Sequence, residues 1–173
     1  MTGPARVTSR SVEETRALAG RLARLVRAGD VVLLVGDLGA GKTAFAQGFA
    51  AALGVEGPVT SPTFALVRHY RCGADRPVRA LIHADVYRTE SLAEVADLAL
   101  GELVEEDAVA LVEWGDRAAL AFDDSTLVVT LDAPDPLGAP DERAIEVVGR
   151  GGWVARADEV RAALSAGREA EAR

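Results

Sequence analysis

The chain has 173 residues, of which 49% are hydrophobic and 27% are charged, so it is long enough for one compact domain and unlike a disordered polymer. Its formal net charge of -8 argues against bulk attraction to nucleic acid or to an anionic membrane. Cys72 is the only cysteine, so no internal disulfide can form. No apolar run approaches the roughly 18 residues that span a bilayer, and no secretory signal is recognisable. We therefore expect a cytoplasmic protein without membrane attachment.

The first two elements are a helix and a buried strand. Ser11 and Glu14 form a capping box, and apolar residues recur at helical spacing from there up to Gly29. The run 31–35, Val-Val-Leu-Leu-Val, is apolar without alternation, as in a strand buried on both faces of a parallel sheet. A glycine-rich loop follows, and residues 42–53 predict the next helix.

The rest of the chain predicts five strands and two helices. The strands are expected at the apolar runs 64–70, 78–85, 108–112, 126–131 and 144–148. The first two of them are joined by a polar turn and predict a hairpin beside strand 31–35. One helix is expected to open at Ser91, which has Glu94 three residues on, and a short one over 157–164.

Residues 36–43, Gly-Asp-Leu-Gly-Ala-Gly-Lys-Thr, match the phosphate-loop pattern G-x-x-x-x-G-K-[ST] between a buried strand and a helix, which is the context it requires. The glycines let the backbone curl so that N–H groups point inward, and the helix adds the positive end of its dipole. Lys42 is expected to reach the β- and γ-phosphates of ATP, and the Thr43 hydroxyl to ligate Mg²⁺. The alternative is a glycine-rich turn with Thr43 as a capping hydroxyl; the flanking elements favour the phosphate loop.

These elements predict an α/β fold with a single P-loop NTPase domain at residues 8–164, followed by a frayed tail at 165–173. The sheet is expected to be mixed and mostly parallel, with helices on both faces and an antiparallel edge.

Two carboxylates end buried strands, where a phosphate loop usually finds its second metal partner. Glu113 closes the run 109–112, and Asp85 closes the run 81–84 with His83 on the same face. We assign Glu113 to Mg²⁺, directly or through water, and Asp85 to the attacking water or to a switch segment that senses the γ-phosphate. Either residue could instead be an ordinary polar cap on a strand.

Other polar and aromatic residues have simpler interpretations. The hydroxyls around Pro62, those of Ser61 and Thr63, can cap the next strand or act as a switch, and the residues alone favour the cap. His83 favours a structural role, and Trp114 favours packing over binding.

Four segments together resemble the TsaE family of bacterial ATPases in their order and spacing. They are the phosphate loop, Ser61-Pro62-Thr63-Phe64, His83-Ala84-Asp85-Val86-Tyr87-Arg88 and Val112-Glu113-Trp114. Many NTPases share the loop, and the other three segments narrow the choice. The resemblance runs from about residue 11 to residue 113. It implies a part in making N6-threonylcarbamoyladenosine at position 37 of tRNA, by binding and hydrolysing ATP together with the TsaD–TsaB heterodimer. Contact with tRNA would then be indirect, through that complex.

The resemblance also implies roles for individual residues. Thr43 and Glu113 would be the Mg²⁺ ligands, and Lys42 and Asp85 would be needed for hydrolysis. Ser61, Pro62 and Thr63 would form a switch segment, and Trp114 would belong to a partner surface. The residues implied to hold the nucleotide are Thr15, Gly39, Ala40, Gly41, Lys42, Thr43 and Ala44, with Thr15 near the adenine.

Two other functions remain open at this point. A small-molecule kinase would use the same loop, magnesium and carboxylates. Its lid could be the arginines Arg68, Arg71, Arg76 and Arg79, although a solvated basic turn is the simpler interpretation. A nucleotide-dependent binding module would hydrolyse ATP only incidentally. We expect slow turnover by the isolated chain, since no arginine finger is evident in cis.

Overall fold

The computed structural model describes residues 3–62, 67–87, 107–118, 122, 125–135, 137 and 139–170. Among these residues the strands are β1 (Ala5–Ser9), β2 (Val31–Val35), β3 (Val67–Arg71), β4 (Ala80–Asp85), β5 (Ala108–Glu113), β6 (Thr126–Asp132) and β7 (Arg143–Gly149). The helices are α1 (Val12–Ala23), α2 (Lys42–Ala52), α5 (Gly115–Ala118), the 3₁₀ helix η1 (Gly151–Arg156) and α6 (Ala157–Ala170). No helix in this part of the chain is long and apolar enough to cross a membrane.

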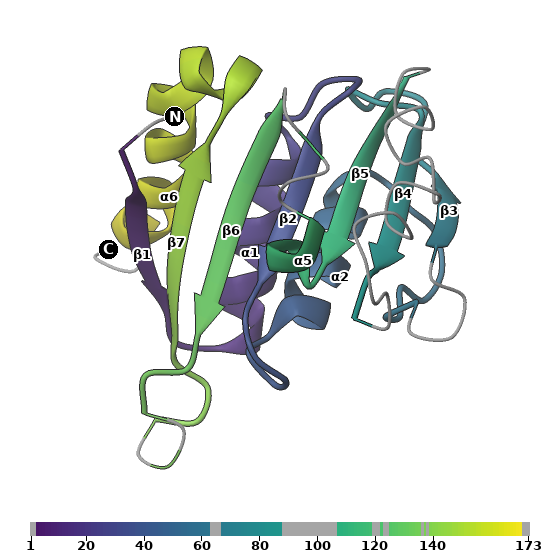
Figure 1. Cartoon of the computed structure of the whole chain (residues 1–173). Helices are drawn as coiled ribbons and strands as arrows, with labels where there is room; N and C mark the ends of the chain where they lie inside the picture. The colour runs from purple at the N-terminus through teal and green to yellow at the C-terminus, as the bar shows by residue number, and fades with distance from the viewer. Residues whose placement is uncertain are drawn as a thin grey trace.

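The strands form one mixed sheet with the order β1-β7-β6-β2-β5-β4-β3 (Figure 1). The four central strands, β6, β2, β5 and β4, run parallel to one another. Antiparallel strands flank them on both sides, β7 and β1 at one edge and β3 at the other. The α/β class and the mixed sheet with a parallel centre are therefore confirmed, and antiparallel pairing occurs at two edges where the sequence suggested one.

The hairpin expected from residues 64–85 forms, but it does not lie beside β2. β3 and β4 pair antiparallel, whereas β5 lies between β4 and β2 and pairs in parallel with both. Burial explains the order. Every residue of β5 is buried, as a central strand requires, while β3 exposes Arg68, His69 and Arg71 and therefore suits the edge.

Helices lie on both faces of the sheet. The helices α1, α2 and α6 cover one face, where Leu22, Phe45 and Val160 pack with Val32 of β2 in the larger hydrophobic core (Figure 1). On the opposite face α5 lies over β2, and Gly115 approaches Leu33 closely. Alternate residues of β2 thus belong to two cores, which explains its unbroken apolar sequence.

The two ends of the chain contribute more structure than the sequence suggested. The strand β1, which pairs antiparallel with β7, was not expected, and α6 continues beyond residue 164 to Ala170. The cap of α1 agrees with the sequence, because the Ser11 side chain accepts a hydrogen bond from the Glu14 N–H at 3.1 Å. The helix expected from Ser91 lies outside the described residues.

The parallel arrangement brings the carboxyl ends of four strands together on one side of the sheet. The carboxyl ends of β2, β4, β5 and β6 lie together, because these four strands are parallel, and α2 begins just after β2. Open α/β sheets bind their ligands at this edge.

Candidate functional site

The phosphate loop connects β2 to α2 through three glycines with positive φ. The φ values of Gly36, Gly39 and Gly41 are 152°, 81° and 101°, and residues that carry a Cβ rarely adopt such positive values. A Cβ on Gly36 would also lie 2.4 Å from the carbonyl oxygen of Leu131 in β6. Gly41 is the N-cap of α2 and has no side chain, so the N–H groups of the first turn receive no hydrogen bond from an N-cap side chain. The backbone thus has the curled form that the sequence predicts.

Lys42 lies inside this loop with its side chain almost buried, 6% exposed. Its Nζ donates hydrogen bonds to the carbonyl oxygens of Gly36 at 2.6 Å and Asp37 at 2.8 Å. The same atom is 3.9 Å from the centroid of the Trp114 ring, which is a cation–π distance. Burial lowers the pKa of Lys42 below its ordinary value, although the nearby carboxylates of Glu113 and Asp85 act in the opposite direction.

The two carboxylates lie side by side at the ends of neighbouring strands. Asp85 of β4 is the register partner of Glu113 of β5, and both side chains are buried. The Oδ2 atom of Asp85 accepts a hydrogen bond from the Ser61 hydroxyl at 3.0 Å, and its Oδ1 accepts one from the Tyr87 N–H at 2.9 Å. Glu113 Oε1 lies 2.9 Å from His83 Nε2. Hydrogen bonds therefore fix both carboxylates.

A cleft of about 420 Å³ joins these groups, a volume within the usual range for small-ligand sites. Its lining residues are Leu38, Gly39, Gly41, Lys42, Thr43, Ser61, Asp85, Tyr87, Glu113 and Trp114. The structure thus brings together the loop, the serine of the expected switch segment and both carboxylates.

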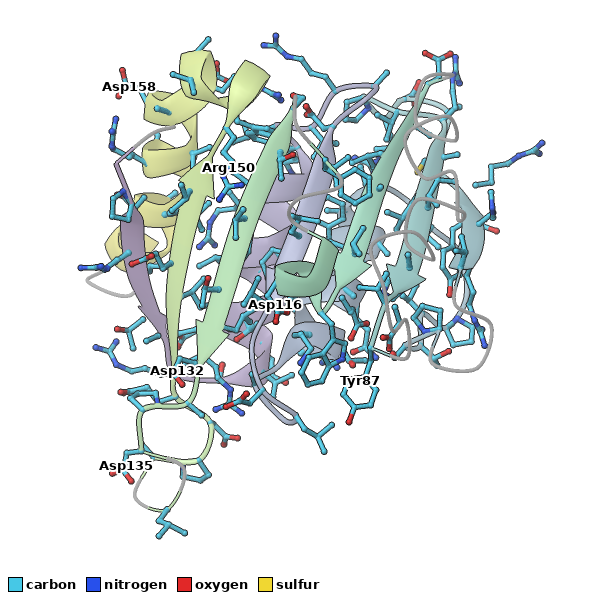
Figure 2. All side chains as sticks on the ribbon, in the orientation of Figure 1. Tyr87, Asp116, Asp132, Asp135, Arg150 and Asp158 are labelled. Atoms are coloured by element: carbon cyan, nitrogen blue, oxygen red, sulfur yellow. The ribbon has the colours of Figure 1, made fainter. Side chains whose placement is uncertain are left out.

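Two aromatic residues form one wall of this cleft. The rings of Tyr87 and Trp114 have centroids 4.7 Å apart and are tilted by 42°. Tyr87 is 48% exposed and projects beyond the sheet edge in Figure 2. Trp114 has a positive φ of 60°, uncommon for a large side chain, and follows Glu113 directly. The backbone at this point turns the indole toward Lys42.

Some of the expected site residues do not line the cleft with their side chains. Thr15 is buried in α1, where its Oγ1 is 2.7 Å from Ser9 Oγ and bonds the carbonyl of Ser11. Its part in binding adenine stays a prediction. Pro62 is buried, and Thr63 lies outside the described residues.

The donors at the site suit magnesium. Among the described residues no group of three or more His, Cys, Asp or Glu side chains could hold a metal ion alone. Mg²⁺ does not require such a group, because it usually takes one or two protein oxygens and completes its shell with water and phosphate. Thr43 and Glu113 line the same cleft, and their side chains carry oxygen donors of this kind.

The sequence did not point to Arg143, at the start of β7. Its guanidinium bonds the carbonyls of Gly39 and Ala40 in the phosphate loop. An arginine that begins a strand is not a specific signal, and the residue lies beyond the segments that carried the resemblance.

Comparison with known proteins decides the family. A profile of the family described as "Threonylcarbamoyl adenosine biosynthesis protein TsaE" matches residues 9–139. The chain belongs to the TsaE family. The protein named tRNA threonylcarbamoyladenosine biosynthesis protein TsaE in Mycobacterium tuberculosis is 45% identical over 139 residues, covering 76% of this chain and 81% of the relative. Its namesake in Streptomyces coelicolor is 41% identical over 144 residues, covering 83% and 95%.

The likeness to a solved structure extends through the C-terminal third. A crystal structure of Bacillus subtilis YdiB matches with a TM-score of 0.71 and 31% identity, covering 97% of this chain and 98% of that one. The resemblance seen in four short segments is thus confirmed as membership of the TsaE family. The match over 97% of this chain includes β6, β7 and α6 in the fold shared with YdiB.

Proposed function

We propose that this chain is a cytoplasmic, Mg²⁺-dependent ATPase of the tRNA N6-threonylcarbamoyladenosine modification system that acts with the TsaD–TsaB heterodimer. The observation that carries ATP binding is the cleft in which the phosphate loop, Lys42 and the Asp85–Glu113 pair meet. The names of the TsaE relatives support the pathway.

Different residues of the cleft bind the phosphates, hold Mg²⁺ and orient the attacking water. Loop N–H groups and the N-terminus of α2 bind the phosphates, and the ammonium of Lys42 adds a positive charge that burial keeps from being screened. Thr43 and Glu113 hold Mg²⁺, which neutralises charge on the phosphate oxygens. Asp85 orients the attacking water and, through Ser61 and Tyr87, positions the segments on either side of it.

The position of the basic turn disfavours the kinase alternative. Three of the four arginines considered for a lid, Arg71, Arg76 and Arg79, lie at the amino end of β4, whereas Asp85 ends that strand on the opposite side of the sheet. The fourth, Arg68, is exposed on the edge strand β3 and is the register partner of His83. Arginines at the amino end of β4 cannot close over phosphates held by the loop. Their exposure fits the solvated basic turn instead.

The decisive experiment measures ATP hydrolysis by the wild type and by Lys42→Ala, with and without the TsaD–TsaB pair. We expect slow phosphate release by the isolated chain, a clear rise when the pair is added and loss of both activities in Lys42→Ala. Phosphoryl transfer to an added small-molecule acceptor would instead support a kinase. Fast turnover by the isolated chain would contradict the dependence on partners.

A second measurement separates hydrolysis from nucleotide-dependent binding. Asp85→Asn keeps the size of the side chain and is expected to bind Mg·ATP while turnover falls at least about a hundredfold. tRNA modification reconstituted with this variant should fail. If modification continues at the wild-type level, hydrolysis is not the function and the chain acts as a binding module.

A further inference from the structure

Arg143 bonds the phosphate loop but is not among the residues that line the cleft. Its Nε donates to the carbonyl oxygen of Ala40 at 2.9 Å, and its Nη2 donates to that of Gly39 at 3.1 Å. Its Nη1 donates to the carbonyls of Pro140 and Glu142, each at 2.7 Å. One guanidinium therefore joins the loop to the hairpin between β6 and β7. We propose that Arg143 is a positioning residue that keeps the loop in its phosphate-binding shape, an inference that rests on the proposed ATP binding.

Because the peptide group is planar, the bond from Arg143 to the Ala40 carbonyl also sets the direction of a neighbouring N–H group. In a trans peptide the C=O and the N–H point to opposite sides. The carbonyl of Ala40 faces Arg143, so the N–H of the same peptide unit, that of Gly41, points away from Arg143. Gly41 lines the cleft and Arg143 does not. The contact thus directs a loop N–H toward the place where phosphate is proposed to bind.

The second contact acts on the preceding peptide. The carbonyl of Gly39 also faces Arg143, and the N–H of that peptide, belonging to Ala40, donates to the Asp37 carbonyl at 3.1 Å. Arg143 therefore supports the tight turn at the tip of the loop as well. Two consecutive peptides, with glycines on either side of Ala40, have their orientation set by one side chain.

Arginine suits this task better than other cations. Its planar fork presents several donors in fixed directions, whereas the lysine ammonium is a single point on a flexible stem. Every acceptor described for the Arg143 guanidinium is a main-chain carbonyl, so the contact does not depend on a partner's ionisation. A glycine-rich loop loses much conformational entropy when it is ordered, and ordering it before the ligand arrives raises affinity.

The test compares Arg143→Gln and Arg143→Lys with Arg6→Gln as the matched control. Arg6 lies on β1, the strand that pairs with β7, but its side chain is exposed and forms an ion pair with Glu146. Two quantities are measured on the full chain: the Kd for Mg·ADP by calorimetry, and hydrogen exchange of the amides of residues 36–44 without nucleotide. We expect both Arg143 variants to weaken Mg·ADP binding about tenfold or more, because the loop is no longer preorganised. Loop exchange should accelerate in both, and the control should match the wild type.

Three results would overturn the inference. Thermal unfolding at a lower Tm with an unchanged Kd and unchanged loop exchange would leave Arg143 only a structural role. Full affinity in Arg143→Lys would show that charge alone matters and not the fork. Equal binding by the wild type and Arg143→Gln would refute the inference alone, whereas a wild type that binds no Mg·ADP would refute the proposed function.

Discussion

His83 Nε2 lies 2.9 Å from Glu113 Oε1, and both side chains are buried. Their strands β4 and β5 are adjacent, and Leu111 is the register partner of His83, so Glu113 follows two residues later on the same face. The imidazole therefore fixes the orientation of the carboxylate proposed to hold Mg²⁺. From the sequence alone His83 was interpreted as structural, and its position gives it influence over the site.

Two substitutions at Glu113 should separate the effect of its negative charge on Mg²⁺ binding from the effect of its contact with His83 on stability. Glu113→Gln keeps an amide that can pair with either tautomer of His83, so we expect near-native stability but at least about tenfold weaker Mg²⁺-dependent nucleotide binding. Glu113→Ala also leaves the buried imidazole without this partner, which should cost a further 1–3 kcal/mol, roughly, in unfolding free energy. Magnesium titration and urea denaturation measure the two effects. Equal stability of both variants would contradict the role of the His83 contact.

The features that the sequence predicted well depend on short stretches of chain. The Ser11 cap requires only the next three residues, and the loop at 36–43 requires a strand before it and a helix after it. Glu113 and Asp85 could be placed at one edge because each directly ends an apolar run. Patterns of this kind can be recognised from the sequence because the residues that define them are close together in the chain.

The features that the sequence missed depend on contacts between distant segments. The apolar runs of β2 and β5 do not say which strand lies between which, so the hairpin was placed beside the wrong neighbour. The burial of β1 alternates, with Val7 and Ser9 buried and Arg6 and Thr8 exposed, but Val7 is the only large apolar residue in the strand, which is too little to predict it from the sequence. Arg143 meets Gly39 and Ala40 across more than a hundred residues, and no local pattern announces that contact.

Trp114 should report nucleotide binding by its fluorescence. Its ring lies 3.9 Å from Lys42 Nζ, so a phosphate that attracts the ammonium must change the charge beside the indole. Titration with Mg·ADP should give a saturable change in emission that Trp114→Phe abolishes. The chain's other tryptophan, Trp153, packs under Arg156 outside the cleft, so Trp153→Phe is the control and should keep the response. A response that survives Trp114→Phe would contradict this contact.

Two glycines at the contact between α1 and α2 should respond oppositely to alanine. A Cβ on Gly48 would lie 2.2 Å from the main-chain oxygen of Arg16, so Gly48→Ala must force the helices apart and should cost at least about 1–3 kcal/mol. A Cβ on Gly20 would meet Ala52 Cβ at 3.4 Å, and alanine favours a helix by about 1 kcal/mol, so Gly20→Ala should be neutral or stabilising. Urea denaturation of both variants checks the difference. Equal losses would mean that α1 and α2 do not pack this closely.

Cys72 should make stability depend on alkaline pH. Burial raises the pKa of its thiol to about 11 from an ordinary value of 9.0. Between these values the unfolded chain releases the proton and the folded chain retains it, so stability is full below pH 9.0 and falls as the pH rises toward about 11. The unfolding free energy of the wild type should therefore fall more steeply over this window than that of Cys72→Ala.

Alkylation offers a second measurement on Cys72. Because the thiolate is the nucleophile, the folded protein should also react far more slowly with iodoacetamide at pH 8 than the urea-unfolded chain. Parallel stability curves for the two proteins, or equal alkylation rates, would show that Cys72 is accessible and ionises normally.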